Sequence, residues 1–230
     1  MRLLAALGQD IRFQFRHGFY YAYTVLTVLY IIVLRLLPDT LVHPALTLIL
    51  FTDICALGFF FIGAIILLER GQKLTESLFV TPLRLHEYLL AKSLSFLFLS
   101  ALSTLLIMLG AWVGGQDLIW FILGVVFSAL IYTLFGLVFA ARARHVNDYF
   151  VKALGVGMFL SLPLFAYLQL FHTPLFYIFP TRATLILLDV LGTDYALSEK
   201  IFSVISLLIW LSIFSWWGYQ RFNKYVRHPA

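Results

Sequence analysis

The residues best able to do chemistry stand in one polar segment, residues 69–92, between two long apolar runs. Its charged and apolar positions alternate in a way that cannot cross hydrocarbon, so the segment must lie outside the membrane core. Its apolar positions predict two short helices, separated by the breaker Thr81-Pro82. The first helix would carry Leu74, Leu78 and Phe79, and the second Leu85, Tyr88 and Leu89. The polar residues that could then face a soluble protein are Glu76, Arg84, His86 and Glu87. The alternative is an interfacial loop that only connects two spans.

A second candidate is Asp53, a carboxylate inside an apolar run. It precedes Glu69 by about 24 Å of helix, which places it in the outer half of a membrane if Glu69 marks the cytoplasmic surface. A carboxylate at this depth is costly and is by default a functional candidate. It could line a substrate pathway, pair with Arg35 or carry a proton, and the alternative is a packing role only.

Several kinds of chemistry have no candidate residues here. The sequence contains no G-x-x-x-x-G-K-[ST] phosphate loop, so we expect no ATP site in this chain. The six histidines never reach metal-ligand spacing, and the single cysteine, Cys55, cannot form a disulfide framework or a cysteine metal cluster. An intramembrane hydrolase or lipid transferase would need a nucleophile beside a base within the apolar runs, and the sequence places no histidine and no pair of acids there. We therefore predict no catalytic residue, no cofactor and no metal site.

The composition is that of an integral membrane protein. Of the 230 residues, 62% are hydrophobic and 12% charged, against roughly 45–50% and 25% in globular proteins, and the mean hydropathy is +0.96. The apolar runs are continuous and about twice as long as the roughly 10-residue strands of a transmembrane barrel, so the fold class is all-α. The charged residues that give the net charge of +5 are distributed among the segments between the apolar runs, which argues against a nucleic-acid surface.

We predict one transmembrane domain, residues 1–230, with about six helical spans. The predicted spans are residues 19–37, 45–68, 93–113, 118–140, 153–171 and 201–219. Pro38 and Pro44 are expected to bracket the first turn, and Pro163 to kink the fifth span. The third and fourth spans are joined by a tight hairpin at residues 114–117, so they must be antiparallel neighbours.

Two further segments are expected to lie at the membrane surfaces. Residues 1–17 have an apolar face at steps of three to four residues, which predicts an amphipathic helix in the membrane interface. Residues 172–200 are too long for a turn, yet their apolar runs are too short to cross. We therefore expect a re-entrant or interfacial helix pair that caps one end of the bundle.

The distribution of positive charge predicts the orientation. Cytoplasmic connections hold the excess of Lys and Arg in membrane proteins. Of the 16 Lys and Arg residues, only Arg35, Arg182 and Lys200 fall in the connections on the other side. We therefore expect a multi-pass protein of the plasma membrane with both termini in the cytoplasm, which requires an even number of spans.

The polar segment and the overall layout resemble the type-2 family of ABC transporter permeases. The loop after the second span in that family typically carries an ordered pattern of acidic residues, a Val-Thr-Pro and a lysine. The matching positions here are Glu69, Arg70, Glu76, Leu78, Val80, Thr81, Pro82, Glu87 and Lys92. A glycine that usually precedes the first loop Glu is absent, because Lys73 and Leu74 stand there.

The resemblance implies a function and partners. The loop would be a coupling helix that docks in a groove of a separate ABC ATPase, with residues 76–82 at its centre and Arg84 beside it. ATP and Mg²⁺ would be bound by that ATPase, and a second permease chain would complete a homodimer or heterodimer. Permeases of this size with a VTPLR loop look similar to bacterial drug exporters, including the fluoroquinolone-export type. The alternatives are an ion-coupled carrier that uses Asp53 and a membrane assembly factor for a haem or polysaccharide pathway.

Overall fold

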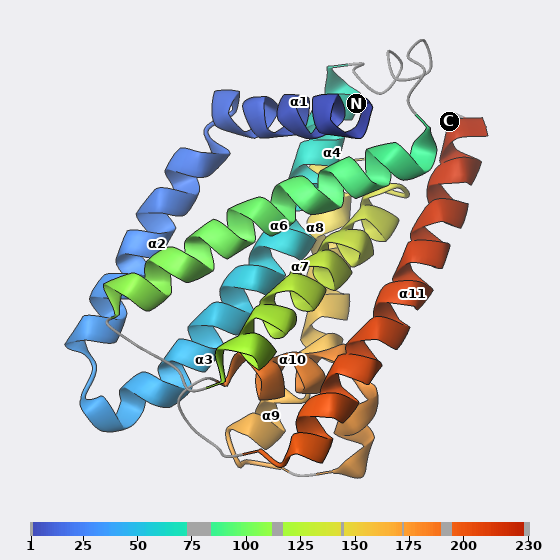
Figure 1. Ribbon diagram of the computed structural model, residues 1–230. Coiled ribbons are helices and arrows are strands. Elements are labelled where there is room, and N and C mark those ends of the chain that lie inside the picture. Colours follow the sequence, from blue (N-terminus) through green and yellow to red (C-terminus); the bar gives the residue numbers. More distant parts are fainter. Residues whose placement is uncertain are drawn as a thin grey trace.

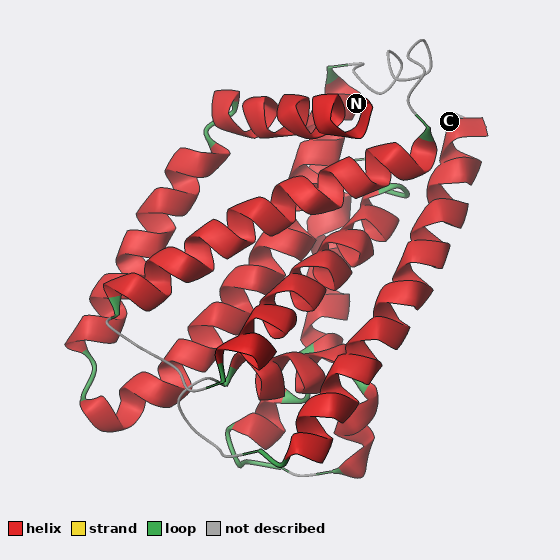
Figure 2. Cartoon of the chain, viewed as in Figure 1, coloured by secondary structure: helices red, strands yellow, loops and turns green. Residues whose placement is uncertain are grey.

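The computed structural model is a helical bundle, which confirms the all-α class (Figure 1). It describes residues 2–72, 84–111, 117–143, 145–171, 173–189 and 195–227, with no side-chain description for 222–227. Figure 2 shows helices joined by short loops throughout this described part of the chain. The elements are α1 Arg2–Arg16, α2 Phe19–Leu36, α3 Asp39–Cys55, the π-helix η1 Ala56–Phe61, α4 Ile62–Gly71, α6 Leu85–Gly110, α7 Leu118–Ala140, α8 Val146–Leu160, α9 Leu164–Tyr167, the 3₁₀-helix η2 Pro174–Ile178, α10 Pro180–Leu188 and α11 Leu197–Arg227.

Within the described residues, 5 helices are long and apolar enough to cross a membrane. They are Phe19–Leu36, Asp39–Gly71, Leu85–Gly110, Leu118–Ala140 and Leu197–Arg221. Each overlaps one of the predicted spans, because an uninterrupted apolar run of about 20 residues satisfies its backbone in hydrocarbon only as a helix. The chain is therefore an integral membrane protein.

The predicted fifth span, residues 153–171, is not one continuous helix. α8 ends at Leu160, and α9 begins at Leu164 after a turn that contains Pro163. Proline lacks an amide hydrogen and its ring clashes with the preceding turn, so the expected kink is a full break. α8 packs beside α4 near one end of the bundle and α9 beside α10 at the other, so the chain still passes between the two ends (Figure 1).

Two other boundaries differ from the prediction. Leu85, Tyr88 and Leu89 do not form a separate short helix, because they are the first two turns of α6. The backbone N–H of Arg84 donates to Glu87 Oε2 at 2.8 Å, which caps this helix, and no breaker follows before the apolar run. At 26 residues, α6 is about 39 Å long and exceeds the roughly 30 Å of hydrocarbon. Pro44 lies inside α3 and not at the end of the turn, since the helix already begins after Pro38.

η1 and α7 pack against each other in close backbone contact, which two glycines make possible. A Cβ added to Gly58 would lie 2.8 Å from the backbone nitrogen of Thr133, and one added to Gly136 would lie 2.7 Å from the carbonyl oxygen of Gly58. Only hydrogen atoms fit between these backbones. The Tyr149 hydroxyl donates to the carbonyl oxygen of Phe59 within the π-helix, so α8 is also attached to this contact.

The two ends of the bundle differ. α1 and both ends of the described chain lie at one end, and α9, η2 and α10 lie at the other (Figure 1). α10 is buried except for Arg182, and it packs against α7, α11 and α3. Two polar contacts join the elements at this end, a hydrogen bond between His43 and Asp189 and an ion pair between Lys200 and Asp117.

Candidate functional site

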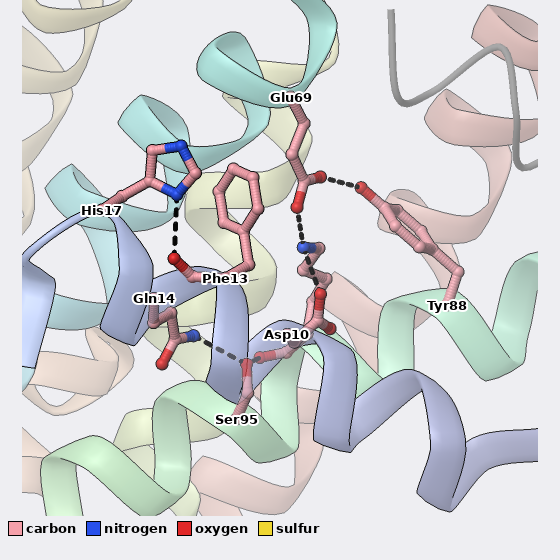
Figure 3. Close-up of polar contacts among 8 residues, drawn as sticks. Asp10, Phe13, Gln14, His17, Glu69, Tyr88 and Ser95 are labelled. Carbon is pink, nitrogen blue, oxygen red and sulfur yellow. Dashed lines mark hydrogen bonds and ion pairs between the residues drawn. The ribbon is translucent and has the colours of Figure 1, made fainter. Parts of the chain in front are cut away.

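Three helices meet at the base of the polar segment. α4 ends there with Glu69, α6 begins there with Tyr88 and Lys92 in its first turns, and α1 crosses both with Asp10 (Figure 3). We call Asp10, Glu69, Tyr88 and Lys92 the loop-base cluster. It lies at the end of α4 and the start of α6, the described elements that flank residues 73–83 in the sequence.

Lys92 is the centre of the cluster and is almost completely buried, with a side-chain exposure of 2%. Its Nζ donates to Asp10 Oδ1 at 2.6 Å and also to Glu69 Oε1. The Tyr88 hydroxyl donates to Glu69 Oε2 at 3.1 Å, so both Glu69 oxygens are satisfied. Burying a charge is costly unless it is paired and hydrogen-bonded, and this network meets that condition for the ammonium and for both carboxylates.

A second set of contacts holds α1 on α6. Gln14 Nε2 donates to Ser95 Oγ at 3.0 Å, and that hydroxyl donates to the carbonyl oxygen of Lys92 at 2.9 Å. The Lys92 ammonium also lies 5.9 Å from the centroid of the Phe13 ring, within the range of a cation–π interaction. The amphipathic helix is therefore attached to the start of α6 by polar contacts as well as by apolar packing.

Arg70 joins the loop base to α7. Its Nη1 donates to the carbonyl oxygen of Ala143 at 2.7 Å and its Nη2 to that of Ala140 at 3.3 Å. Ala140 is the last residue of α7, where the helix dipole favours a cation, and Ala143 lies three residues beyond it. The Arg70 guanidinium therefore makes hydrogen bonds within the chain, in addition to the ATPase contact predicted for it.

The predicted loop residues divide into two groups. Glu69, Arg70, Arg84 and Glu87 lie at the two ends of the loop, and Glu87 caps α6 through the Arg84 amide. The predicted docking centre lies outside the described residues and comprises Glu76, Leu78, Val80, Thr81 and Pro82.

Asp10 is the member of the cluster that sequence reasoning missed. It falls at helical spacing from Leu3, Leu7 and Gln14, which places a carboxylate in line with apolar positions of α1. An acid on the apolar face of an amphipathic helix needs a cation beside it when it is buried. Lys92 matched the last position of the loop pattern but had no role of its own, so it was the available cation. That spacing was the available signal.

Burial raises the pKa of Asp10 above its usual value; the ammonium of Lys92 opposes this shift, and the Glu69 carboxylate adds to it. The folded protein therefore holds the Asp10 proton more tightly than the unfolded chain does. The stability from this group is present below the unfolded pKa and is lost as pH rises through the folded pKa. Relative to Asp10→Asn, the native chain should gain stability as pH falls from 8 to 4.

Thermal unfolding in detergent at several pH values tests this expectation. Asp148→Asn is the matched control, because Asp148 forms a more exposed pair with Lys152 four residues away. Its stability difference from the native chain should change little over the same range. A native chain that loses stability relative to Asp10→Asn on acidification would contradict the sign of the Asp10 shift.

Asp53 lies apart from the loop-base cluster, on α3. Its side chain is completely buried, and neither carboxylate oxygen makes a hydrogen bond of standard geometry in the described part of the chain, although the Ser103 side chain lies close enough to interact with it. Pairing with Arg35, one of the three alternatives, is not seen in the structure: Arg35 Nε donates to the carbonyl oxygen of Gly110 at 2.9 Å, and Asp53 makes no salt bridge among the described residues. No group of three His, Cys, Asp or Glu side chains that could hold a metal ion occurs among the residues described.

Comparisons with known proteins give a consistent result. The model of the fluoroquinolones export permease protein family matches residues 1–229. Two curated proteins are each 29% identical over 188 residues, covering 81% of this chain and 79% of their own length. Both are named fluoroquinolones export permease proteins, from Mycobacterium tuberculosis strains CDC 1551 / Oshkosh and ATCC 25618 / H37Rv.

Proposed function

The chain belongs to the fluoroquinolones export permease family, and from this premise we propose that it is the membrane subunit of an ABC exporter. It is a multi-pass membrane protein of a bacterial family and a permease. Two permease chains would form the pathway, and two ATPase subunits would bind ATP and Mg²⁺ and hydrolyse the ATP. The exported compounds would be amphipathic drugs, as the names of the relatives suggest.

The loop-base cluster supports this proposal most directly. Residues 73–83 connect α4 and α6 in the sequence, and Lys92 of α6 is joined to α4 and α1 through two carboxylates. Arg70 adds the end of α7 to the same base. A push on the loop from an ATPase would therefore move four packed helices together, because a rigid base transmits displacement that a flexible one absorbs.

The location of the chain ends agrees with the proposed orientation. Both ends of the described chain lie at the same end of the bundle as α1 and the end of α4 (Figure 1). If the loop faces a cytoplasmic ATPase, both termini are cytoplasmic, as the positive charges predict. The outward end is then the one formed by α9 and α10.

Co-purification with the ATPase encoded beside the gene tests the proposal. In the variant Glu76→Ala with Leu78→Ala, we expect association to weaken about 30-fold, since an interface hot spot contributes about 2 kcal/mol. The matched control is Leu197→Ala with Glu199→Ala, which changes the same residue types at the opposite end of the bundle. The control should bind the ATPase like the native chain and stimulate the same ATP hydrolysis in lipid.

Asp53 favours one other function. A buried carboxylate that forms no salt bridge in the described chain is what an ion-coupled carrier would use to bind its ion. Such a carrier would use an ion gradient to drive substrate transport in liposomes that contain no ATPase. If no ATPase associates and gradient-driven transport requires Asp53, the carrier replaces the exporter. In the exporter, we propose that Asp53 lies beside the substrate pathway.

A further inference from the structure

A side cavity of about 270 Å³ opens between α3, η1, α7, α8 and α10. Its α3 wall is the turn that also carries Asp53, but Asp53 itself does not line the cavity. Three of its wall residues are buried aromatic side chains, Phe51, Phe59 and Tyr132. Met158 lies at its mouth and is 75% exposed in the isolated chain, so the opening faces sideways out of the bundle. In a membrane, this mouth would face lipid or a second permease.

Three local features create this space. η1 is a π-helix, which widens the backbone at the cavity wall, and π-helical turns are frequent at functional sites. The break after α8 removes a continuous helix from the opposite wall. Gly157 has no side chain where a Cβ would lie 3.5 Å from the Phe59 ring and 3.9 Å from the Phe60 ring. A single methyl group fits at Gly157, but a larger side chain would enter the cavity.

The cavity wall is uncharged, and three of its four hydroxyl groups, those of Tyr132, Ser161 and Thr181, are bonded within the protein. Thr181 Oγ1 donates to the carbonyl oxygen of Leu160 at 2.7 Å, and the Tyr132 hydroxyl lies 3.2 Å from Thr181 Oγ1. Ser161 Oγ donates to the carbonyl oxygen of Gly157 at 2.8 Å. A molecule in the cavity therefore meets mainly carbon atoms, so its inserted part must be apolar.

The rings in the wall present faces and edges in several directions. Phe51 and Tyr132 lie edge to face at 82°, and Phe59 is tilted by 58° against Phe60. A flat aromatic guest can stack on one ring and meet the edge of another, which are the arrangements that aromatic pairs prefer. A flexible acyl chain gains nothing from this geometry beyond its buried area.

The volume sets the size of the guest. A cavity of about 150 Å³ holds one benzene ring, and pockets for whole drug-sized molecules are about 300–1,000 Å³. The present cavity, at about 270 Å³, fits two fused rings but not the polar remainder of such a molecule. We infer that the cavity between η1, α7 and α8 binds the fused-ring aromatic part of an amphipathic ligand that enters from the membrane, an inference that builds on the proposed export function.

The single cysteine, Cys55, lines this cavity and is a natural reporter for the test. The purified permease, in nanodiscs without an ATPase, is labelled with N-ethylmaleimide, and the rate is followed by mass spectrometry. With 2-naphthol at about ten times its Kd, about nine-tenths of the sites are filled, so the labelling rate should fall about tenfold. 1-Octanol, a linear alcohol of similar polarity, should protect Cys55 much less.

Two glycines of the same helix provide matched variants. In Gly157→Leu, the new side chain enters the cavity, so 2-naphthol should no longer slow the labelling of Cys55. In Gly155→Leu, nothing lies within 4 Å of the added Cβ, so protection should persist. If native Cys55 does not react, the same measurement is made on Met158→Cys in a Cys55→Ser background.

Each outcome is decisive for the cavity. Protection that is lost only in Gly157→Leu supports the inference. No protection by 2-naphthol at either reporter, or protection that persists in Gly157→Leu, overturns it. Equal protection by 1-octanol also overturns it and assigns the cavity to lipid chains. Because no ATPase is present, these results are independent of the co-purification test: a failed exporter assignment leaves protection intact, and a failed cavity leaves ATPase association intact.

Discussion

Replacing Lys92 with methionine is expected to lower the free energy of unfolding by about 3–5 kcal/mol, the cost of breaking a buried ion pair by removing one partner. The ammonium is the shared partner of Asp10 and Glu69, whose side chains are only 13% and 8% exposed. Without it, two buried carboxylates face one another. Thermal and denaturant unfolding in detergent measure the loss, and α1 should detach first because its polar contacts include this pair.

The matched control is Lys152→Met. Lys152 pairs with Asp148 four residues earlier, but its side chain is 53% exposed, so this change should cost about 0–1 kcal/mol. Glu69→Gln added to Lys92→Met should recover part of the loss, because it removes one of the two uncompensated charges. If Lys92→Met is no more destabilising than Lys152→Met, the loop base is not held by the cluster, and the support it lends to the coupling proposal fails.

The apolar runs were sufficient to predict most of the bundle. A run of about 20 apolar residues has essentially one conformation in hydrocarbon, so α2, α7 and α11 follow from composition and length alone. The amphipathic period likewise predicted a helix over the residues of α1. These elements depend on local pattern, and local pattern is what a single sequence contains.

The features that shape the two sites depend on contacts between distant residues. Lys92 and Asp10 are 82 positions apart, and nothing in their spacing indicates that α1 crosses α6. The π-helix at Ala56–Phe61 has an ordinary apolar sequence, and its Tyr149 contact joins residues 90 positions apart. The α8 break was only partly predictable, because proline indicates a kink while the neighbouring helices determine how far the chain departs from it.

The loop shows the same division. Its resemblance to a coupling segment rests on residue types in order, which a sequence contains in full, whereas the packing of its ends does not follow from them. Glu69 and Arg70 matched the pattern at the start of the loop, yet their side chains hold α6 and α7 in place. A residue that matches the coupling-loop pattern can therefore support ATPase binding indirectly, by holding in place the helices that flank the docking residues.

Gly136→Ala is the second change expected to have a large effect, a loss of about 2–3 kcal/mol in the free energy of unfolding. The added Cβ would lie 2.7 Å from the carbonyl oxygen of Gly58 and 2.9 Å from that of Phe59. Backbone atoms of a packed π-helix cannot rotate away as a side-chain end can, so η1 and α7 must separate. Since Phe59 also lines the aromatic cavity, protection of Cys55 by 2-naphthol should weaken in the same variant.

Gly155→Ala separates this steric effect from the intrinsic effect of replacing a helical glycine. Nothing lies within 4 Å of a Cβ at Gly155, so alanine there should stabilise the helix by about 0.5–1 kcal/mol. The two substitutions are chemically identical and should change stability in opposite directions. If Gly136→Ala also stabilises the chain, η1 and α7 are not in backbone contact, and the cavity wall that depends on this contact is placed differently. Opposite signs would instead establish that glycine at position 136 is required for the packing that positions the π-helix.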